Sequence, residues 1–282
     1  MTAKSQDKPI GMWESHLPYN NAIGVVTDGH TLFTICNQPF FTYNPSSGDM
    51  QPFSKVNGMA DIGMQCIAYD ATTSTAVLIY SAGNIDLFKN NTFYNITDLK
   101  IKSIAGNKTV NHAYCEGGIA YLSTSIGVLV IDLTTHNINE TYQFNFHSQS
   151  VPVNGFTGFG SYFYAITQAG LYRADKTSPQ LQNYQVWQLV DSTDSFSYIS
   201  AVNNQLFLAN SRYVYSLVND SAKKIYTCSS TSDTLITHID GSNNSLLISE
   251  YHPNQFNGDV KIMDSGYNII DSATSLGHPL QA

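Results

Sequence analysis

Apolar and polar residues follow a pattern that recurs six times along this chain. Each copy is a β-rich apolar run, a polar turn that usually contains glycine, and a second β-rich run. Successive turns lie about 42 to 46 residues apart, the spacing of a four-stranded propeller blade and of few other repeats. The pattern predicts an all-β fold, a β-propeller of four-stranded antiparallel blades. The copies span residues 32–44, 77–88, 120–133, 163–175, 206–217 and 246–264.

The third copy shows why each repeat is interpreted as a blade. Residues 120–124 alternate small or apolar side chains with polar ones, and the return strand at 128–133 is apolar on both faces. Stacking one blade between two others requires strands buried on both faces. The outer strands at 92–99 and 137–144 are polar, as expected at the rim. We place the innermost strands, nearest the axis, at residues 22–28, 65–70, 110–116, 153–160, 198–203 and 235–240.

Counting blades leaves a spare segment, residues 13–20, before the first repeat. Propellers usually use a spare terminal strand to close the ring, because closure removes exposed sheet edges. The sixth repeat already supplies its own outer strand at 267–274, so we predict seven blades, with the last one incomplete or closed by the N-terminal strand. A complete ring of six blades is the alternative. We interpret residues 1–12 as a disordered leader or tag, and 13–282 as one propeller domain, the first module of a longer protein.

Composition indicates where in the cell the protein works and which ligands it does not bind. Charged residues make up only 12% of the chain, and Asn, Ser, Thr and Tyr are abundant, which favours an extracytoplasmic protein that meets sugars. The formal charge is −8 and the only arginines are Arg173 and Arg212, so no basic stripe is available for nucleic acid. No apolar run reaches the roughly 18 residues of a membrane span. We expect a location at the cell surface, associated with the outer membrane, or in the periplasm.

The spacing of cysteines and histidines indicates no metal site and no cofactor. The four cysteines form no C-x-x-C pair, and we expect reduced, buried thiols. A bridge between Cys36 and Cys66, on adjacent repeats, is the alternative. His112, His147 and His238 lie on or near predicted strands without a closely spaced second ligand, so we interpret them as structural.

The chain carries no sequence signature of a nucleophile elbow, a phosphate-binding loop or a zinc protease, and we predict that it is not an enzyme. One catalytic alternative stays open, a carbohydrate-active enzyme on a propeller scaffold. It would need Asp70, Glu116, Asp132 and Asp240 to converge at the axis as paired carboxylates for glycoside chemistry. The simpler interpretation of these acids is strand-end capping and turn formation.

An ordered series of phrases between Trp13 and Tyr142 carries a family resemblance. The phrases are W-x-S-H-L-x-Y at 13–19, GNIDLF at 83–88, NITDLK at 95–100, KSIAGNKTVN at 102–111 and AYLSTSIGVLVIDL at 120–133. Together they resemble the N-terminal β-propeller of PorZ-like proteins of the type IX secretion system of Bacteroidota, a family with two-component-regulator-type propellers. Its members resemble one another in having two seven-bladed propellers and a C-terminal secretion-signal domain. The rest of the chain resembles the family only in its repeat pattern.

The resemblance implies a non-catalytic binding and scaffold module in an attachment complex at the outer membrane. There, a sortase-like protease removes the C-terminal signal of cargo proteins and joins them to anionic lipopolysaccharide. The implied partners are this protease, other outer-membrane proteins of the complex, and anionic lipopolysaccharide or another glycan. A propeller that senses polysaccharide in the periplasm, as part of a hybrid two-component receptor, is the alternative with the same fold.

For a ligand, the mouth of the central channel is the expected site, because loops from every blade converge there. Asn154, Tyr162 and Tyr198 offer an amide and aromatic faces for sugar rings. Arg173 and Arg212 are the side chains able to bind a phosphate or carboxylate bidentately. For each arginine the competing interpretation is an ordinary contact between blades.

Overall fold

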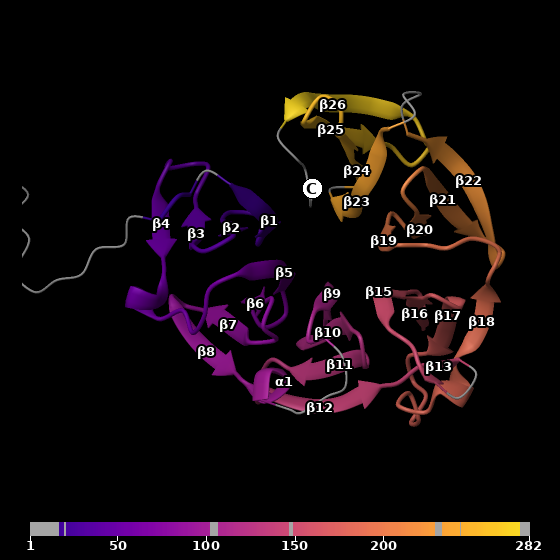
Figure 1. The fold of residues 1–282 in the computed structure, drawn as a ribbon, viewed down its shortest axis with the longest axis horizontal. Helices are drawn as coiled ribbons and strands as arrows, with labels where there is room; N and C mark the ends of the chain where they lie inside the picture. Colours follow the sequence, from indigo (N-terminus) through magenta and orange to yellow (C-terminus); the bar gives the residue numbers. More distant parts are fainter. Residues whose placement is uncertain are drawn as a thin grey trace, which may run out of the picture.

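The computed structural model describes residues 17–19, 21–101, 107–146, 149–228, 233–242 and 244–276. Their strands form six four-stranded antiparallel sheets, each from a consecutive stretch of chain, and one two-stranded hairpin. In Figure 1 the six sheets stand around a common axis as propeller blades, each with its first strand nearest the axis. The predicted architecture of four-stranded antiparallel blades is confirmed.

The blades follow one another in chain order. Blade 1 comprises β1 (Ala22–Thr27), β2 (Leu32–Cys36), β3 (Phe40–Tyr43) and β4 (Met50–Phe53). Blade 2 comprises β5 (Met64–Asp70), β6 (Thr75–Tyr80), β7 (Ile85–Lys89) and β8 (Thr92–Ile96). Blade 3 comprises β9 (Val110–Glu116), β10 (Ile119–Thr124), β11 (Gly127–Asp132) and β12 (Asn137–Tyr142).

The second half of the ring repeats this arrangement. Blade 4 comprises β15 (Val153–Phe159), β16 (Tyr162–Thr167), β17 (Gly170–Asp175) and β18 (Gln188–Asp191). Blade 5 comprises β19 (Tyr198–Val202), β20 (Gln205–Ala209), β21 (Tyr213–Val218) and β22 (Ser221–Thr227). Blade 6 comprises β23 (Leu235–Ser242), β24 (Ser245–His252), β25 (Asn257–Met263) and β26 (Ile269–Leu276). The connections hold the hairpin β13 (Asn145–Phe146) and β14 (Gln149–Ser150), and the short helices η1 (Lys55–Asn57), α1 (Asp98–Ile101) and η2 (Tyr184–Val186).

The core consists of the seams between blades, as strand β6 shows. All six of its residues are buried, because blade 2 lies between blades 1 and 3. Side chains alternate across a strand, so Val77 and Ile79 pack into the seam with blade 3, and Ala76, Leu78 and Tyr80 into the seam with blade 1. The continuous apolar runs in the sequence are therefore strands packed on both faces.

Glycine is required for steric reasons at two equivalent positions of the repeated turns. Gly127 begins β11 and Gly170 begins β17, with φ values of 121° and 128° that residues with a side chain rarely adopt. A Cβ atom at these positions would collide with the carbonyl oxygens of Tyr142 and Asp191, respectively, at the ends of the neighbouring outer strands. Glycine is needed there because the outer strand passes too close for any side chain.

The first and last blades do not pack on each other as the other neighbours do. Each innermost strand contacts the next from β1 to β23, whereas no comparably extensive contact joins β23 to β1 among the described residues. In Figure 1 these two blades flank the widest opening of the ring. In β24, Leu246 and Ile248 are buried in the seam with blade 5, but Leu247 and Tyr251 are only half-buried. Among the described residues, blade 6 therefore has one face that no other blade packs against.

Some details of the sequence-based expectation differ in the structure, and some residues lie outside it. The described strands form six blades and include no seventh. Blade 6 takes its outer strand from β26, as expected for residues 267–274. Of the spare segment, Tyr19 packs its ring edge-on against Phe41 of blade 1, with centroids 6.1 Å apart. The strand expected at 92–99 ends at Ile96, because residues 98–101 turn into α1. Residues 1–12 and His147 lie outside the described residues.

All four cysteines are free thiols, so the alternative bridge between Cys36 and Cys66 is not formed. Cys36 is buried and burial raises its pKa, while burial raises the pKa of Cys66 to about 12. Such thiols stay protonated and act as small apolar side chains. Among the described helices, none is long and apolar enough to cross a membrane.

Candidate binding site

The innermost strands of the blades line a channel along the axis. Two cavities of about 560 and 480 Å³ share Ile67, His112, Ala113 and His238 in their walls, so they are the two halves of one channel. One half opens where the innermost strands begin, and the other where they end. A concave site lined by several blades on a rigid frame is the natural place for a ligand.

A ring of β-bulges surrounds the opening where the innermost strands begin. In five blades the register of the innermost strand shifts at its second residue, or at its third in blade 6, and a bulge redirects the side chain at that position. We call these residues the bulge ring: Ile23, Gln65, Asn111, Asn154 and Thr237. All of them except Asn154 line this half of the channel, and Tyr198 at the start of β19 lines it as well.

Two amides of the bulge ring are anchored to the next blade. The Gln65 side chain donates a 2.8 Å hydrogen bond from Nε2 to the carbonyl of Val110, and Asn111 donates one of the same length to Val153. Each amide is therefore held in place by backbone. The Gln65 Oε1 atom is buried and accepts no hydrogen bond from any described residue. A buried acceptor without a partner is costly, so this atom has unused hydrogen-bonding capacity next to the channel.

The lining of the channel is almost free of charge. Among its described residues only Asp240 is an acid, and none is Lys or Arg. Burial lowers the pKa of His112 to about 4 and that of His238 to about 3, with His112 adding to the second shift, so both imidazoles are neutral at physiological pH. Burial also raises the pKa of Asp240 to about 6, although hydrogen bonds from Gly241 and Ser200 oppose this. The channel suits a neutral polar ligand better than an anion.

The five residues predicted from the sequence lie in three separate places. Tyr198 lines the channel, 5.7 Å edge-on from the ring of His238, and Asn154 belongs to the bulge ring. Tyr162 and Arg173 meet in a different, outer cavity of about 260 Å³ on blade 4. Arg212 is at neither site. Of the five, Tyr198 alone lines the channel, and Asn154 lies on the bulge ring but is not one of the lining residues.

Both arginines are engaged in contacts between blades. The guanidinium of Arg173 lies 4.9 Å from the centre of the Tyr162 ring and 2.5 Å from Asp220 of the β21–β22 turn in blade 5. Arg212 donates from Nη1 to the carbonyl of Thr234, 3.1 Å away, which ties blade 5 to the start of blade 6. These geometries match the competing interpretation of each arginine as a packing contact.

The four acids considered for glycoside chemistry do not converge at the axis. Asp70 accepts hydrogen bonds from Thr73 and from the Gly118 N–H, and Asp132 accepts from the backbone of its own turn. Glu116 forms an ion pair with Lys176 at 2.6 Å. Only Asp240 faces the channel. The carboxylate pair that hydrolysis would need is not assembled from these residues.

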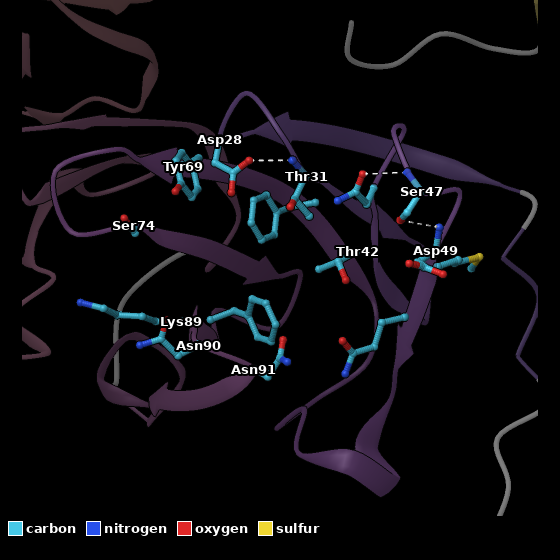
Figure 2. A pocket seen from close by; sticks show the side chains of 15 residues that line it. Asp28, Thr31, Thr42, Ser47, Asp49, Tyr69, Ser74, Lys89, Asn90 and Asn91 are labelled. Atoms are coloured by element: carbon cyan, nitrogen blue, oxygen red, sulfur yellow. Dashed lines mark hydrogen bonds between the residues drawn. The ribbon is translucent and has the colours of Figure 1, made fainter.

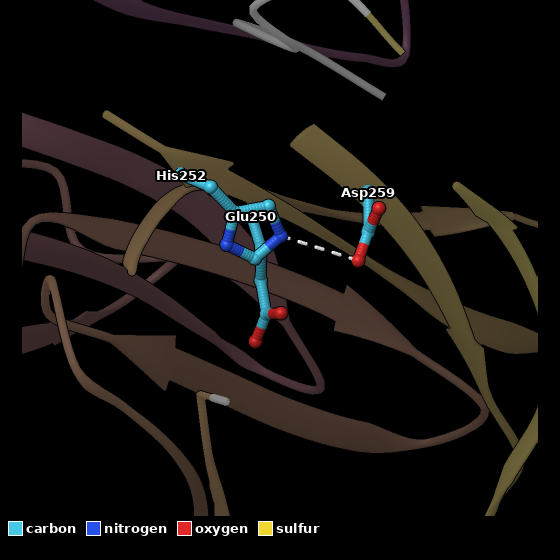
Figure 3. Close-up of side chains that lie close together, drawn as sticks. All are labelled: Glu250, His252 and Asp259. Atoms are coloured by element: carbon cyan, nitrogen blue, oxygen red, sulfur yellow. Dashed lines mark hydrogen bonds and ion pairs between the residues drawn. The ribbon is translucent and has the colours of Figure 1, made fainter. Parts of the chain in front are cut away.

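A cluster that the histidine spacing did not reveal lies on β24 and β25. Ligand atoms of Glu250, His252 and Asp259 are within 4.8 Å of one another, a spacing compatible with a metal ion. In Figure 3 His252 is bonded to Asp259, at 3.2 Å, and the Glu250 carboxylate lies apart from that pair. Glu250 instead accepts hydrogen bonds of 2.7 Å from both Lys261 and Tyr226. The Lys261 ammonium supplies the positive charge here, so we interpret the cluster as a structural network.

Sequence reasoning also missed Gln65 and Asn111. Their signal is present in the repeats, since an amide follows the first apolar residue of the innermost strand in Met64-Gln65, Val110-Asn111 and Val153-Asn154. The bulges that direct these amides depend on pairing between strands and are not visible in a single repeat.

The fold and the lined channel define a six-bladed β-propeller with a ligand-sized axial cavity. The chain matches the family of the PorZ N-terminal β-propeller domain (TSS9) over residues 32–188, more than half of its length. It belongs to this family. The comparison with curated proteins found no match.

Solved structures show the same fold. PorZ of Porphyromonas gingivalis, described as an essential surface component of the type IX secretion system, is similar with a TM-score of 0.79 and 18% identity, over 96% of this chain and 35% of that one. Extracellular domains of two Bacteroides thetaiotaomicron (B. thetaiotaomicron) proteins described as hybrid two-component systems are also similar. Their TM-scores are 0.65 and 0.64, their identities 13% and 11%, and the matches cover 93% and 94% of this chain and 37% and 36% of theirs. This chain spans about a third of the length of each.

Proposed function

We propose that this chain is a non-catalytic binding and scaffold module of the complex that attaches type IX secretion cargo to the cell surface. Membership of the PorZ N-terminal propeller family is the observation that carries the proposal. The similar structure of P. gingivalis PorZ, a surface component of that system, supports it. On this proposal the protein works outside the cytoplasm, at the cell surface on the outer membrane or in the periplasm.

The proposed ligand is a glycan, and anionic lipopolysaccharide is the first to test. The net charge of −8 and a channel lining that contains an acid, Asp240, and no Lys or Arg disfavour direct contact with phosphate groups. The amides of Gln65 and Asn111 both donate and accept hydrogen bonds, which suits sugar hydroxyls. We therefore assign the bulge ring to the sugar rings of the glycolipid and leave its anionic groups in solvent.

The test is binding of the purified chain to lipopolysaccharide from a Bacteroidota strain, compared with material that lacks the anionic polysaccharide. We expect saturable binding to the first material alone. The Gln65→Leu variant should bind about fivefold or more weakly, because it loses an amide that meets the ligand. The exposed Gln182→Leu change on blade 4 is the matched control and should have no effect. Absence of binding by the wild-type chain would leave only the scaffold role.

The scaffold role is tested with the proposed protein partners. The purified chain is mixed with the sortase-like protease of the attachment complex and analysed by size-exclusion chromatography with light scattering. A complex of defined mass supports docking on this propeller. Separate elution of the two proteins at micromolar concentration would contradict it.

We also propose that a seventh blade fills the opening between blades 6 and 1 in a longer parent protein. Two observations support this: the half-buried side chain of Leu247 on blade 6, and the lack of an extensive β23–β1 contact among the described residues. A chain extended by one further repeat should unfold at a higher temperature than this one. A melting temperature that does not rise in the extended chain would contradict a seventh blade that closes the ring.

A second candidate function is supported by the two B. thetaiotaomicron structures. As the sensor propeller of a hybrid two-component receptor, the protein would bind polysaccharide fragments in the periplasm. A membrane-spanning helix and a kinase domain in the parent gene would favour this function over the first. A C-terminal secretion-signal domain in that gene would favour the first.

A further inference from the structure

A cavity of about 460 Å³ lies beside the channel, where blade 1 meets blade 2, and Tyr69 is in the walls of both. Its walls come from the β1–β2 and β3–β4 turns of blade 1 and from β5 and the β7–β8 turn of blade 2. It is therefore on the face where the innermost strands end, opposite the bulge ring. We call it the seam groove. Figure 2 shows Ser47 and Asp49 on one side of it and Lys89 and Asn90 on the other, with Thr42 between them.

Polar side chains of blade 1 line the seam groove. Thr42 of β3 is paired with Phe33 on one side and Gln51 on the other, and Phe33 faces blade 2. At the same place in blades 2 and 3, the third strand presents the buried apolar residues Leu87 and Val130 to the next blade. In blade 1 the polar side chains of Thr42 and Gln51 line an open cavity at this place instead.

An aromatic surface lies at the base of the seam groove. The Phe33 ring is stacked on Tyr69, with centroids 5.3 Å apart and planes 17° apart, and meets Phe88 edge-on at 6.3 Å. Phe33 and Tyr69 are only half-buried, although each lies within an otherwise packed seam. Burial raises the pKa of Tyr69, so its hydroxyl keeps its proton and can donate. Rings held rigidly at an accessible surface suit stacking on the apolar face of a sugar.

The rim offers carboxylate oxygens that are not used within the protein. Asp28 accepts the backbone N–H groups of His30 and Thr31 through Oδ1, at 2.8 and 2.7 Å, and its Oδ2 accepts none from the described residues. The carboxylate of Asp49, on the β3–β4 turn, is exposed and likewise accepts none from them. Opposite, Asn90 and Asn91 form a tight turn in which both residues have positive φ. Acceptors on one wall thus face amides on the other.

We propose that the seam groove binds a neutral sugar unit of a polysaccharide. Phe33 would pack against the C–H face of the ring, and Asp28 and Asp49 would accept hydrogen bonds from its hydroxyls. Gln51 and Asn91 would complete the polar contacts. The two carboxylates outnumber the one lysine, Lys89, so a phosphorylated or uronic sugar is disfavoured by charge. This inference rests on the proposed function in one respect: the glycan that the protein is proposed to bind would be the source of the sugar unit.

The test uses neutral oligosaccharides prepared from mannan, glucan and galactan as probes, with calorimetry on the whole chain. We expect saturable binding of at least one of them. Asp49→Ala should weaken it about tenfold or more, because a charged acceptor of ligand hydroxyls is lost. Glu140→Ala is the matched control, since Glu140 is also exposed but lies on the outer strand of blade 3. The Asp49 carboxylate has no partner among the described residues, so its removal should leave the melting temperature unchanged.

Two results would overturn the proposal. One is that none of the three neutral probes binds saturably to the wild-type chain. The other is that a probe binds and Asp49→Ala keeps full affinity, while Gln65→Leu loses it, which would place the sugar in the channel. Neither result contradicts the proposed function, which is tested separately with lipopolysaccharide. Conversely, binding of a neutral probe through Asp49 with no binding of lipopolysaccharide would support the seam groove and reject the glycolipid.

Discussion

Blade 6 contains two carboxylates that the protein accommodates in opposite ways. Glu250, in the seam with blade 5, is fully buried and accepts hydrogen bonds from Lys261 and Tyr226. Asp240, in the channel, accepts only the N–H of its neighbour Gly241 and, at 3.5 Å, the hydroxyl of Ser200 among the described residues. Glu250 thus has a half-buried counter-ion, whereas no described residue supplies one to Asp240.

The difference shows that buried polar groups in the seam stabilise the fold, whereas those in the channel remain available to a ligand. In the seam, Lys261 and Tyr226 compensate the charge of Glu250 in a place that no ligand reaches. In the channel, burial without a counter-ion raises the pKa of Asp240 to about 6, so the carboxyl changes charge near neutral pH. Side chains of the seam hold blades together, whereas those of the channel keep hydrogen-bonding capacity for a ligand. The comparison can be tested at each site.

The largest effect is expected from removing the counter-ion. Lys261→Met leaves Glu250 as a buried charge without its ion-pair partner, which should lower the free energy of unfolding by about 3–5 kcal/mol. Urea denaturation followed by circular dichroism would measure it. A loss below about 1 kcal/mol, the value typical of exposed pairs, would show that the pair is hydrated.

The matched control removes both charges together. The double variant Glu250→Gln with Lys261→Met should recover most of the lost stability, because no uncompensated charge remains in the seam. If the double variant is as unstable as the single one, the loss comes from packing of the lysine chain rather than from charge.

Most of the fold was accessible from the sequence because its signal is local and repeated. The period of the turns and the continuous apolar runs predicted the blades, and the innermost strand predicted at 110–116 coincides with β9. The number of blades was less accessible, since it depends on whether the last blade meets the first, a contact between distant parts of the chain. The β13–β14 hairpin and α1 were missed because they lie in connections that do not repeat.

The candidate site was less predictable for a physical reason. Gln65, Asn111 and Thr237 come together only because separate blades place them at one end of the channel. Their sequence positions indicate the strand but not the bulge that turns them inward. Thr42 gave no signal either, because a threonine in a strand indicates an open seam only when the structure shows which blade it faces.

A smaller effect is expected from the phenol that completes the seam network. Tyr226 donates to Glu250 at 2.7 Å and accepts from Lys261 at 2.8 Å, so Tyr226→Phe removes two hydrogen bonds to charged groups and keeps the ring. The free energy of unfolding should fall by about 2 kcal/mol. Tyr213→Phe, whose ring lies 3.8 Å below the Lys224 ammonium on exposed blade 5 surface, is the control and should change it by less than about 0.5 kcal/mol.

The smallest effect is expected in the channel, and it depends on pH. The pKa of Asp240 is about 6 in the folded protein, against about 4 in an unfolded chain. The folded state therefore holds this proton more tightly, and the stability it contributes is complete below about pH 4 and lost as pH rises to about 6.

Asp240→Asn keeps the acceptor oxygen and stays neutral, so it should be the more stable protein above about pH 6, by about 1 kcal/mol after allowance for solvent in the channel. Turn aspartates such as Asp132 and Asp264 have lowered pKa values, so they make stability rise with pH instead of fall. They are present in both proteins, and their contribution cancels when the stability of one protein is subtracted from that of the other. A difference that does not change between pH 4 and pH 7 would mean that Asp240 is as well compensated as Glu250.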